Sequence, residues 1–183
     1  MSEQVVKIAD SYATPGALGL TGFSLTTILL AFYDLGIFTD TVALIAMSIF
    51  VGGIAQFCAG LFAFKKGSTF DMVTFCGFGT FWISFAYILI TGGASGVSIG
   101  IYLLIWALLA IALLFGVIKL KAKFLIGVLA LLAIVLIVTA AFFITGTAII
   151  ATIAGILALV LGLLAFYVAM AITLNEVGYK LPC

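Results

Sequence analysis

Long runs of apolar residues, separated by short polar breaks, set the pattern of the chain. A helix needs about 20 mostly apolar residues to cross about 30 Å of hydrocarbon, and six runs reach that length. The pattern therefore predicts an all-α integral membrane protein with six transmembrane helices in each protomer. The expected spans are roughly 15–33, 41–64, 68–91, 97–118, 124–144 and 148–174.

Short polar segments flank this membrane domain. In residues 1–14, apolar side chains recur at i, i+3, i+4 and i+7, which predicts an amphipathic helix on the cytoplasmic membrane surface. Thr14 is expected as N-cap of the first span, with Pro15 at its first helical position. Residues 15–174 should form the membrane domain and residues 175–183 a cytoplasmic tail. The apolar positions of the first segment are Val5, Ile8, Ala9 and Tyr12.

The lysines all fall on one side of the predicted membrane. They lie in the amino-terminal segment, in the loops after spans two and four, or in the tail, whereas the other three loops have none. Because cytoplasmic loops are enriched in lysine and arginine, both termini are predicted to be cytoplasmic, in the plasma membrane. This requires an even number of spans and so supports six. The lysines are Lys7, Lys65, Lys66, Lys119, Lys121, Lys123 and Lys180.

Composition excludes several classes of function. With 67% hydrophobic and 7% charged residues and a mean hydropathy of +1.52, the chain cannot coat a water-soluble globule. Membrane lipid is therefore an expected partner. A net charge of +1 without arginine or histidine offers no basic surface, so nucleic acid is not. Cys58, Cys76 and Cys183 form no Cys-x-x-Cys pair, so no metal site and no cofactor are expected. No nucleophile has a visible base partner, so an enzyme is not expected either.

Polar side chains within the spans are candidates for a transport pathway. They concentrate in spans one, two, three and six, which are therefore expected to line it, with spans four and five facing lipid or partner subunits. Hydroxyls in membrane helices usually bond their own backbone, whereas the amide of Gln56 needs partners or a wet cavity. The candidates are Thr21, Ser24, Thr26, Thr27, Gln56, Thr74, Thr80, Ser84, Thr152 and Tyr167.

Small residues form stripes along spans two and six. Such stripes let another helix approach closely, either within the protomer or across a subunit interface, and the sequence leaves both open. The stripes are Ser48, Gly52, Ala55, Ala59 and Ala63 in span two, and Gly155, Ala158, Gly162, Ala165 and Ala169 in span six.

No carboxylate or lysine lies near the centre of a span. Asp34, Asp40 and Glu176 lie at span ends, and Asp71 is expected to form an S-x-x-D capping box with Ser68. The chain therefore lacks the intramembrane acid on which tightly proton-coupled carriers usually rely.

Aromatic residues recur along span three at i, i+3, i+7 and i+10. Packing in the core or against lipid explains such a stripe by default. The alternative is that one ring projects into a pore as a hydrophobic gate. The residues are Phe75, Phe78, Trp82 and Phe85.

Several sequence blocks resemble the acetate uptake transporter family. Residues 13–20 read A-T-P-G-A-L-G-L and are followed by Gly22-Phe23, similar to the family signature N-P-A-P-L-G-L. Further blocks follow in the family's order and cover nearly the whole chain. They are G-G-I-A-Q-F at 52–57, F-K-K-G-S-T-F at 64–70, F-W at 81–82, L-N-E at 174–176 and L-P at 181–182.

This resemblance implies a six-helix protomer that assembles into a homo-hexamer, with a substrate path through each protomer. It also implies a constriction formed by Phe23, Phe78 and Leu132, in which Phe78 replaces a tyrosine of the family and lacks its hydroxyl. Thr14 replaces the asparagine of the signature and can still cap the helix and donate a hydrogen bond.

The sequence therefore predicts channel-like transport of acetate and similar short monocarboxylates. Within the membrane, hydrogen-bond donors of the protein must replace the water that hydrates the carboxylate. Two alternatives stay open: a proton-coupled acetate or succinate symporter that uses Asp34 or Glu176, and a non-transporting structural protein. Ammonia or a larger dicarboxylate would fit the same architecture. The predicted substrate-binding residues are Thr14, Gln56, Thr21, Thr26, Thr74 and Asn175.

Overall fold

Six membrane-spanning helices make up almost all of the computed structural model, which describes residues 13–182. All six predicted spans are confirmed, and their ends differ from the expectation by one or two residues. The amphipathic helix predicted for residues 1–14 lies almost wholly outside the described residues. The elements are α2 (Pro15–Asp34), α3 (Val42–Ile49), η1 (Phe50–Ala55), α4 (Gln56–Lys65), α5 (Thr69–Thr91), α6 (Gly96–Leu120), α7 (Lys123–Thr145) and α8 (Ala148–Glu176).

The second span consists of three consecutive pieces. An α-helix, α3, passes into the π-helical segment η1 and then into α4. A π-helix makes i→i+5 hydrogen bonds and is wider than an α-helix, and such segments are frequent at functional sites. The Gly52-Gly53 pair lies within this segment.

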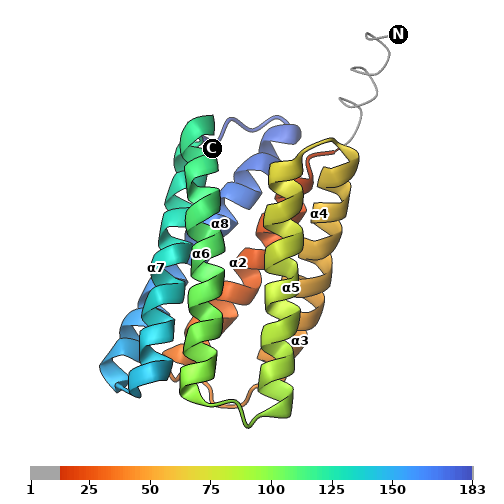
Figure 1. Ribbon diagram of the computed structural model, residues 1–183. Coiled ribbons are helices and arrows are strands. Elements are labelled where there is room, and N and C mark those ends of the chain that lie inside the picture. The colour runs from red at the N-terminus through yellow and green to blue at the C-terminus, as the bar shows by residue number, and fades with distance from the viewer. Residues whose placement is uncertain (1–12, 183) are drawn as a thin grey trace.

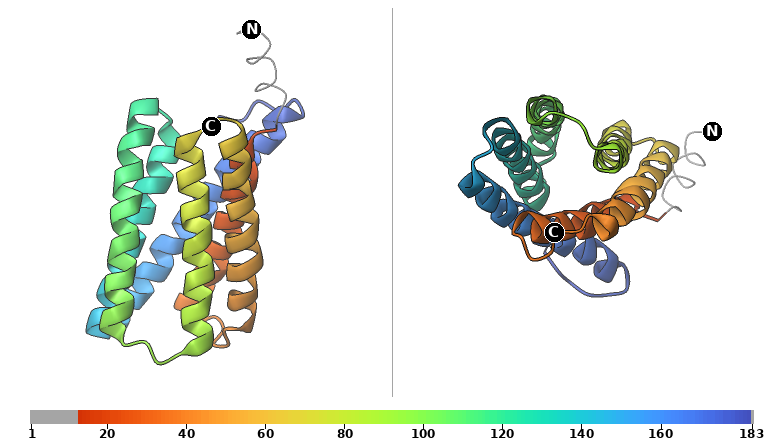
Figure 2. Two further views of the ribbon diagram at one scale, coloured as in Figure 1. Left: turned by 45° about the vertical axis from the view of Figure 1, so that its right-hand side comes forward. Right: turned by 90° about the horizontal axis from the view of Figure 1, so that it is seen from below.

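The helices lie around a ring in chain order (Figures 1 and 2). Each span packs against the next, and α8 closes the ring against α2. The contact between α2 and α8 is the most extensive, and that between α5 and α6 is among the weakest.

The small-residue stripe of span six faces α2 of the same protomer, which resolves the choice that the sequence left open. A β-carbon added at Gly162 would lie 2.6 Å from Ile28 Cγ1 and 3.1 Å from the Ile28 backbone nitrogen. Glycine and alanine at these positions let the two backbones approach closely. The alanines of the stripe, Ala158, Ala165 and Ala169, are fully buried.

Side chains cap some of the helices. Asp71 N donates to Ser68 Oγ at 3.3 Å, so the predicted cap of α5 is confirmed. The return bond differs from a capping box: Ser68 Oγ donates to Asp71 Oδ2 at 2.8 Å, because Ser68 N already donates to Ala63 O. Thr14 occupies the N-cap position of α2 but makes no side-chain capping bond.

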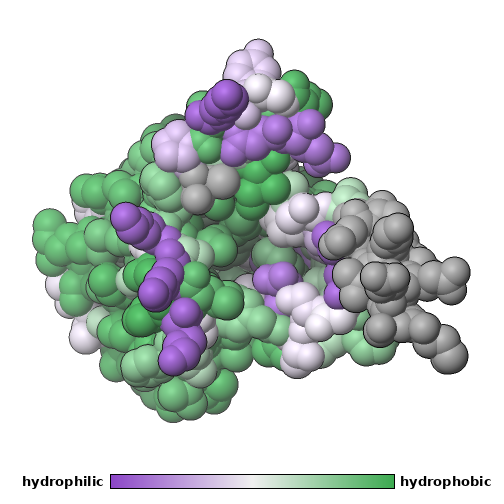
Figure 3. Space-filling model, turned by 90° about the horizontal axis from the view of Figure 1, so that it is seen from above, coloured by the Kyte–Doolittle hydropathy of each residue, from purple (hydrophilic) through white to green (hydrophobic). Residues whose placement is uncertain are grey.

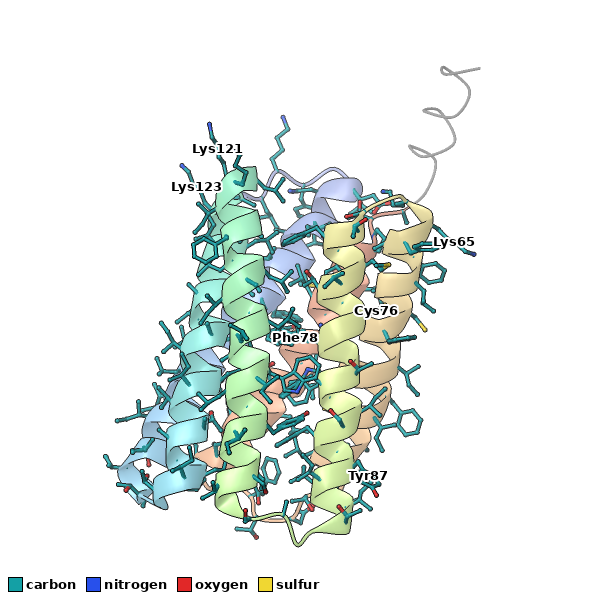
Figure 4. All side chains as sticks on the ribbon, in the orientation of Figure 1. Lys65, Cys76, Phe78, Tyr87, Lys121 and Lys123 are labelled. Atoms are coloured by element: carbon teal, nitrogen blue, oxygen red, sulfur yellow. The ribbon has the colours of Figure 1, made fainter. Side chains whose placement is uncertain are left out.

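Lysines gather at one end of the bundle, here called the lysine end. Figure 4 labels Lys65, Lys121 and Lys123 there, and Tyr87 toward the opposite, far end. Figure 3 looks onto the lysine end, where hydrophilic residues gather above the apolar helices. This distribution agrees with the lysine bias read from the sequence, and the orientation in the membrane stays a prediction.

Candidate functional site

Two cavities lie inside the ring of helices. The lysine-end cavity has a volume of about 50 Å³ and is lined by residues of α2, α4, α5, α6 and α7, including Gln56, Asp71 and Thr74. The far-end cavity has a volume of about 150 Å³, and its lining includes Asp34 and Trp82. A single water needs about 10–15 Å³ of such volume, so both cavities have room for water or a small solute.

The three residues of the predicted constriction lie together where the two cavities meet. Phe23 and Leu132 line both cavities, and Phe78 lines the lysine-end cavity. The rings of Phe23 and Phe78 meet edge to face at a centroid distance of 6.4 Å. All three side chains are at most 5% exposed. The cavities are therefore separated by an apolar contact between α2, α5 and α7.

Other aromatic rings support this contact from the side of α5 and α6. Phe78 packs against Phe81 at 6.3 Å and against Trp106 at 5.9 Å. Phe81 stacks on Tyr102, whose hydroxyl donates to Phe81 O at 3.1 Å and lies 2.6 Å from Ser84 Oγ. The hydrogen-bonded Tyr102 fixes the position of the Phe81 ring against which Phe78 rests.

The structure brings two of the predicted substrate-binding residues to the lysine-end cavity, next to the constriction. Gln56 is 2% exposed, and its Oε1 has no hydrogen-bond partner among the described residues. The Thr74 hydroxyl donates to Phe70 O at 2.8 Å, which leaves its lone pairs as acceptors. Of the two side chains, only Gln56 has hydrogen-bond donors, on its Nε2, that are not committed to a backbone carbonyl one turn earlier.

The other four predicted substrate-binding residues do not line either cavity. The hydroxyls of Thr21 and Thr26 donate to backbone carbonyls one turn earlier, at 2.8 Å and 2.9 Å. Thr14 lines a separate surface groove with Lys65. Asn175 holds the tail, because its amide donates to Leu181 O and its Oδ1 accepts from Leu181 N.

The expectation that spans one, two, three and six line the pathway was wrong for the cavities. Span five lines both of them through a row of residues that are apolar except for Thr139, whereas no residue of span six borders either one. The reason is that α8 turns its small residues to α2, while α7 turns leucines and valines inward. Counting polar residues could not reveal a cavity with apolar walls. The cavity-lining residues of α7 are Leu125, Val128, Leu129, Leu132, Val135, Leu136, Thr139 and Phe143.

Each cavity contains one carboxylate in its lining. Asp71 in the lysine-end cavity is bonded to Ser68, whereas Asp34 in the far-end cavity has neither an ion-pair nor a hydrogen-bond partner among the residues that the structure describes. Glu176, the other acid considered for proton coupling from the sequence, is exposed at the end of α8 and borders neither cavity. Of these two span-end acids, only Asp34 is placed where it can affect a solute in the ring.

Comparisons with known proteins agree with this arrangement. The model of the GPR1/FUN34/yaaH family matches residues 3–179. The succinate-acetate/proton symporter SatP of Escherichia coli (strain K12) is 38% identical over 170 residues, which is 90% of each chain. Acetate permease A of Emericella nidulans is 37% identical over 87 residues, covering 46% of this chain and 29% of that protein. A solved structure of the bacterial acetate channel SatP matches with a TM-score of 0.89 and 37% identity, covering 92% of this chain and 96% of that one.

Proposed function

Since the chain belongs to the GPR1/FUN34/yaaH family, we propose that it transports acetate and similar short monocarboxylates through a pore within each protomer. The observation that carries the proposal is the pair of cavities that meet at Phe23, Phe78 and Leu132. Movement of these side chains would join the two cavities. The names of the relatives support acetate as the substrate.

The physical problem in such a pore is the cost of removing water from a carboxylate. An unpaired anion in an apolar medium is strongly unfavourable, so transport requires donors near the constriction. On the lysine side, Gln56 lines the same cavity as Phe23. Lysines at the same end of the bundle raise the local concentration of anions. The narrow apolar contact itself disfavours large and strongly hydrated solutes.

A channel-like mechanism is the first candidate, because the described membrane core has no ionisable group at the constriction. A proton-coupled symport is the second, and one observation favours it: Asp34 lines the far-end cavity without a partner among the described residues. Protonation would convert Asp34 from a group that repels an anion into a donor. The Escherichia coli relative is named a succinate-acetate/proton symporter, which points the same way for that protein.

The assembly and placement are part of the same proposal. We expect a homo-hexamer in the plasma membrane, with both termini in the cytoplasm. Large apolar side chains exposed on the outer surface, such as Phe64, Leu108 and Phe115, offer area for lipid or neighbouring protomers. The lysine end faces the cytoplasm in this arrangement, as the positive-inside rule requires.

Flux of radiolabelled acetate into liposomes that contain the purified protein tests the proposed function. The measurement is made with and without a pH gradient, which shows whether flux depends on protons. Passive flux of the neutral acid through the lipid is measured in empty liposomes and subtracted. Saturable flux above that background supports transport. Equal flux in empty and protein-containing liposomes rejects acetate transport and favours the alternative of a non-transporting structural protein.

A further inference from the structure

A groove on the outside of the ring lies between α2 and α4 at the lysine end. Its volume is about 370 Å³, larger than that of either cavity inside the ring. Its apolar wall includes Leu18 and Phe62, which are 42% and 52% exposed. The groove shares no lining residue with the two inner cavities. It is therefore separate from the path proposed for the solute.

Two consecutive lysines form the polar part of this groove. Lys65 ends α4 and is exposed, and Lys66 follows it as the half-buried C-cap. Figure 4 shows Lys65 pointing away from the bundle. The hydroxyl of Thr14 also lines the groove, and it makes no capping bond to α2. None of the described residues that line the groove is acidic, so the groove attracts an anion.

Polar and apolar side chains follow a fixed order along the groove. Leu18 lies one turn after Thr14 on α2, which begins at the lysine end. Phe62 lies one turn before Lys66 on α4, which ends there, and Lys66 N donates to Phe62 O at 3.1 Å. One helical turn advances by about 5.4 Å. The lysines and the hydroxyl therefore lie at the end of the bundle, and the apolar wall lies one turn deeper.

This order matches that of a phospholipid in a bilayer, whose phosphate lies above its acyl chains. A free anion would contact the lysines and leave the apolar wall uncovered. An apolar helix would cover the wall and leave the lysines without a counter-charge. Basic pockets between transmembrane helices on the cytoplasmic side bind anionic headgroups in other membrane proteins, and the lysine end is the one predicted to face the cytoplasm.

We propose that this groove binds one anionic phospholipid in each protomer. The ammonium groups of Lys65 and Lys66 and the hydroxyl of Thr14 donate to the phosphate oxygens. The first part of an acyl chain packs against Leu18 and Phe62. The bound lipid thereby bridges α2 and α4. This inference goes beyond the proposed transport and does not depend on the solute.

Native mass spectrometry of the full chain counts bound lipids directly. Phosphatidylglycerol and phosphatidylcholine with the same acyl chains are each titrated into the detergent-solubilised protein. We expect the first phosphatidylglycerol per protomer to bind more tightly than phosphatidylcholine. In the double variant Lys65→Gln/Lys66→Gln, its apparent Kd should rise about thirtyfold, because two lysine contacts with an anionic headgroup are lost. Binding of phosphatidylcholine should stay as in the wild type.

The double variant Lys119→Gln/Lys123→Gln is the matched control. It removes the same charge from the same end of the bundle, but these lysines belong to α6 and α7 and do not line the groove. The apparent Kd for phosphatidylglycerol should change less than about twofold. If both double variants weaken binding equally, the lipid responds to the charge of the whole lysine end, and the groove is rejected as its site.

A second pair of variants tests the acyl chain. Phe62→Ala should raise the apparent Kd for phosphatidylglycerol about fivefold, because apolar contact area is lost. Phe115→Ala, which removes a ring that is 70% exposed on α6, should leave it unchanged. Glycerol phosphate has the headgroup charge without acyl chains and should not displace the lipid. Displacement by glycerol phosphate, with unaltered binding in Phe62→Ala, would replace the lipid by a free anion and overturn the inference.

Other occupants of the groove would also be recognised. If residues 1–12 of the chain or a neighbouring protomer fill it, phosphatidylglycerol cannot reach Lys65 and Lys66. The wild type and Lys65→Gln/Lys66→Gln would then bind this lipid equally. That result rejects the inference.

Discussion

The interface between α2 and α8 and the space between α5 and α6 are both formed by neighbouring helices, yet opposite kinds of residue build them. Glycine and alanine let α2 and α8 touch along their length. Between α5 and α6, the rings of Phe81, Tyr102 and Trp106 keep the backbones apart, with Phe81 and Trp106 at 5.4 Å. Small residues thus join α2 and α8 into a close-packed frame, and large ones separate α5 from α6 beside the cavities.

A bulky residue in the frame should have the largest effect. In Gly162→Leu, the new side chain would meet Ile28, including its backbone nitrogen, so α8 must move away from α2. Overpacking of this kind costs about 1–3 kcal/mol or more, and we expect loss of monodisperse protein and of flux together. Leu163→Phe is the control, because Leu163 is 54% exposed on the outer surface. Gel filtration and thermal melting in detergent measure both variants, and equal behaviour of the two would contradict the frame.

A smaller ring in the lumen should change flux more than folding. Phe78→Ala removes the ring that meets Phe23, so the constriction widens and acetate flux should rise about tenfold, which is a barrier lower by about 1.4 kcal/mol. Phe78→Leu keeps part of the side-chain volume, so its acetate flux should lie between those of the wild type and Phe78→Ala. Phe115→Ala removes a phenylalanine that is 70% exposed on the outer surface and should leave flux unchanged. Acetate flux that is unaltered or lower in well-folded Phe78→Ala would contradict the hypothesis that this ring limits the flux.

Charge in the far-end cavity should have a moderate effect. Two unit charges about 4 Å apart interact by about 1 kcal/mol at the dielectric of water, so Asp34→Asn should raise acetate flux about fivefold. Asp40→Asn is the control, since Asp40 is exposed and accepts from Val42 N. Acetate accumulation driven by a pH gradient is measured in the same liposomes. If Asp34→Asn instead abolishes that accumulation, the proton-coupled mechanism replaces the channel-like one.

The helix cap at the start of α5 should have the smallest effect. Ser68→Ala removes the acceptor for Asp71 N and should lower stability by about 1 kcal/mol without changing the flux. Thr69→Ala, at an exposed neighbouring position, should lower stability less. Thermal melting compares the two. A large loss of flux in Ser68→Ala would mean that Asp71 acts in the path rather than at the helix end.

The fold could be predicted from the sequence almost completely, because the length and polarity of the apolar runs determine the spans. The stripe of small residues in span six was also visible, but its partner was not, since a stripe that contacts a helix of the same protomer looks the same as one that contacts a neighbouring subunit. That Gly162 meets Ile28 is a consequence of the ring closure between the first and last spans, which the local pattern does not encode.

The site was predicted less completely. The family resemblance pointed to Phe23, Phe78 and Leu132, and the structure places these three together. Polar residues were a poor guide, since the hydroxyls of Thr21 and Thr26 are used by their own helix. The π-helical segment left no sequence signal except the Gly52-Gly53 pair.

Chemical block at the constriction tests the central claim most directly. In a background with Cys58, Cys76 and Cys183 changed to serine, Leu132→Cys places a thiol where both cavities meet. Leu108→Cys, 67% exposed on the outer surface, is the matched control. A small neutral thiol reagent is added, labelling is verified by mass spectrometry, and acetate flux is measured in liposomes. We predict loss of most flux in labelled Leu132→Cys and no loss in labelled Leu108→Cys; undiminished flux through fully labelled Leu132→Cys would contradict a path between the two cavities.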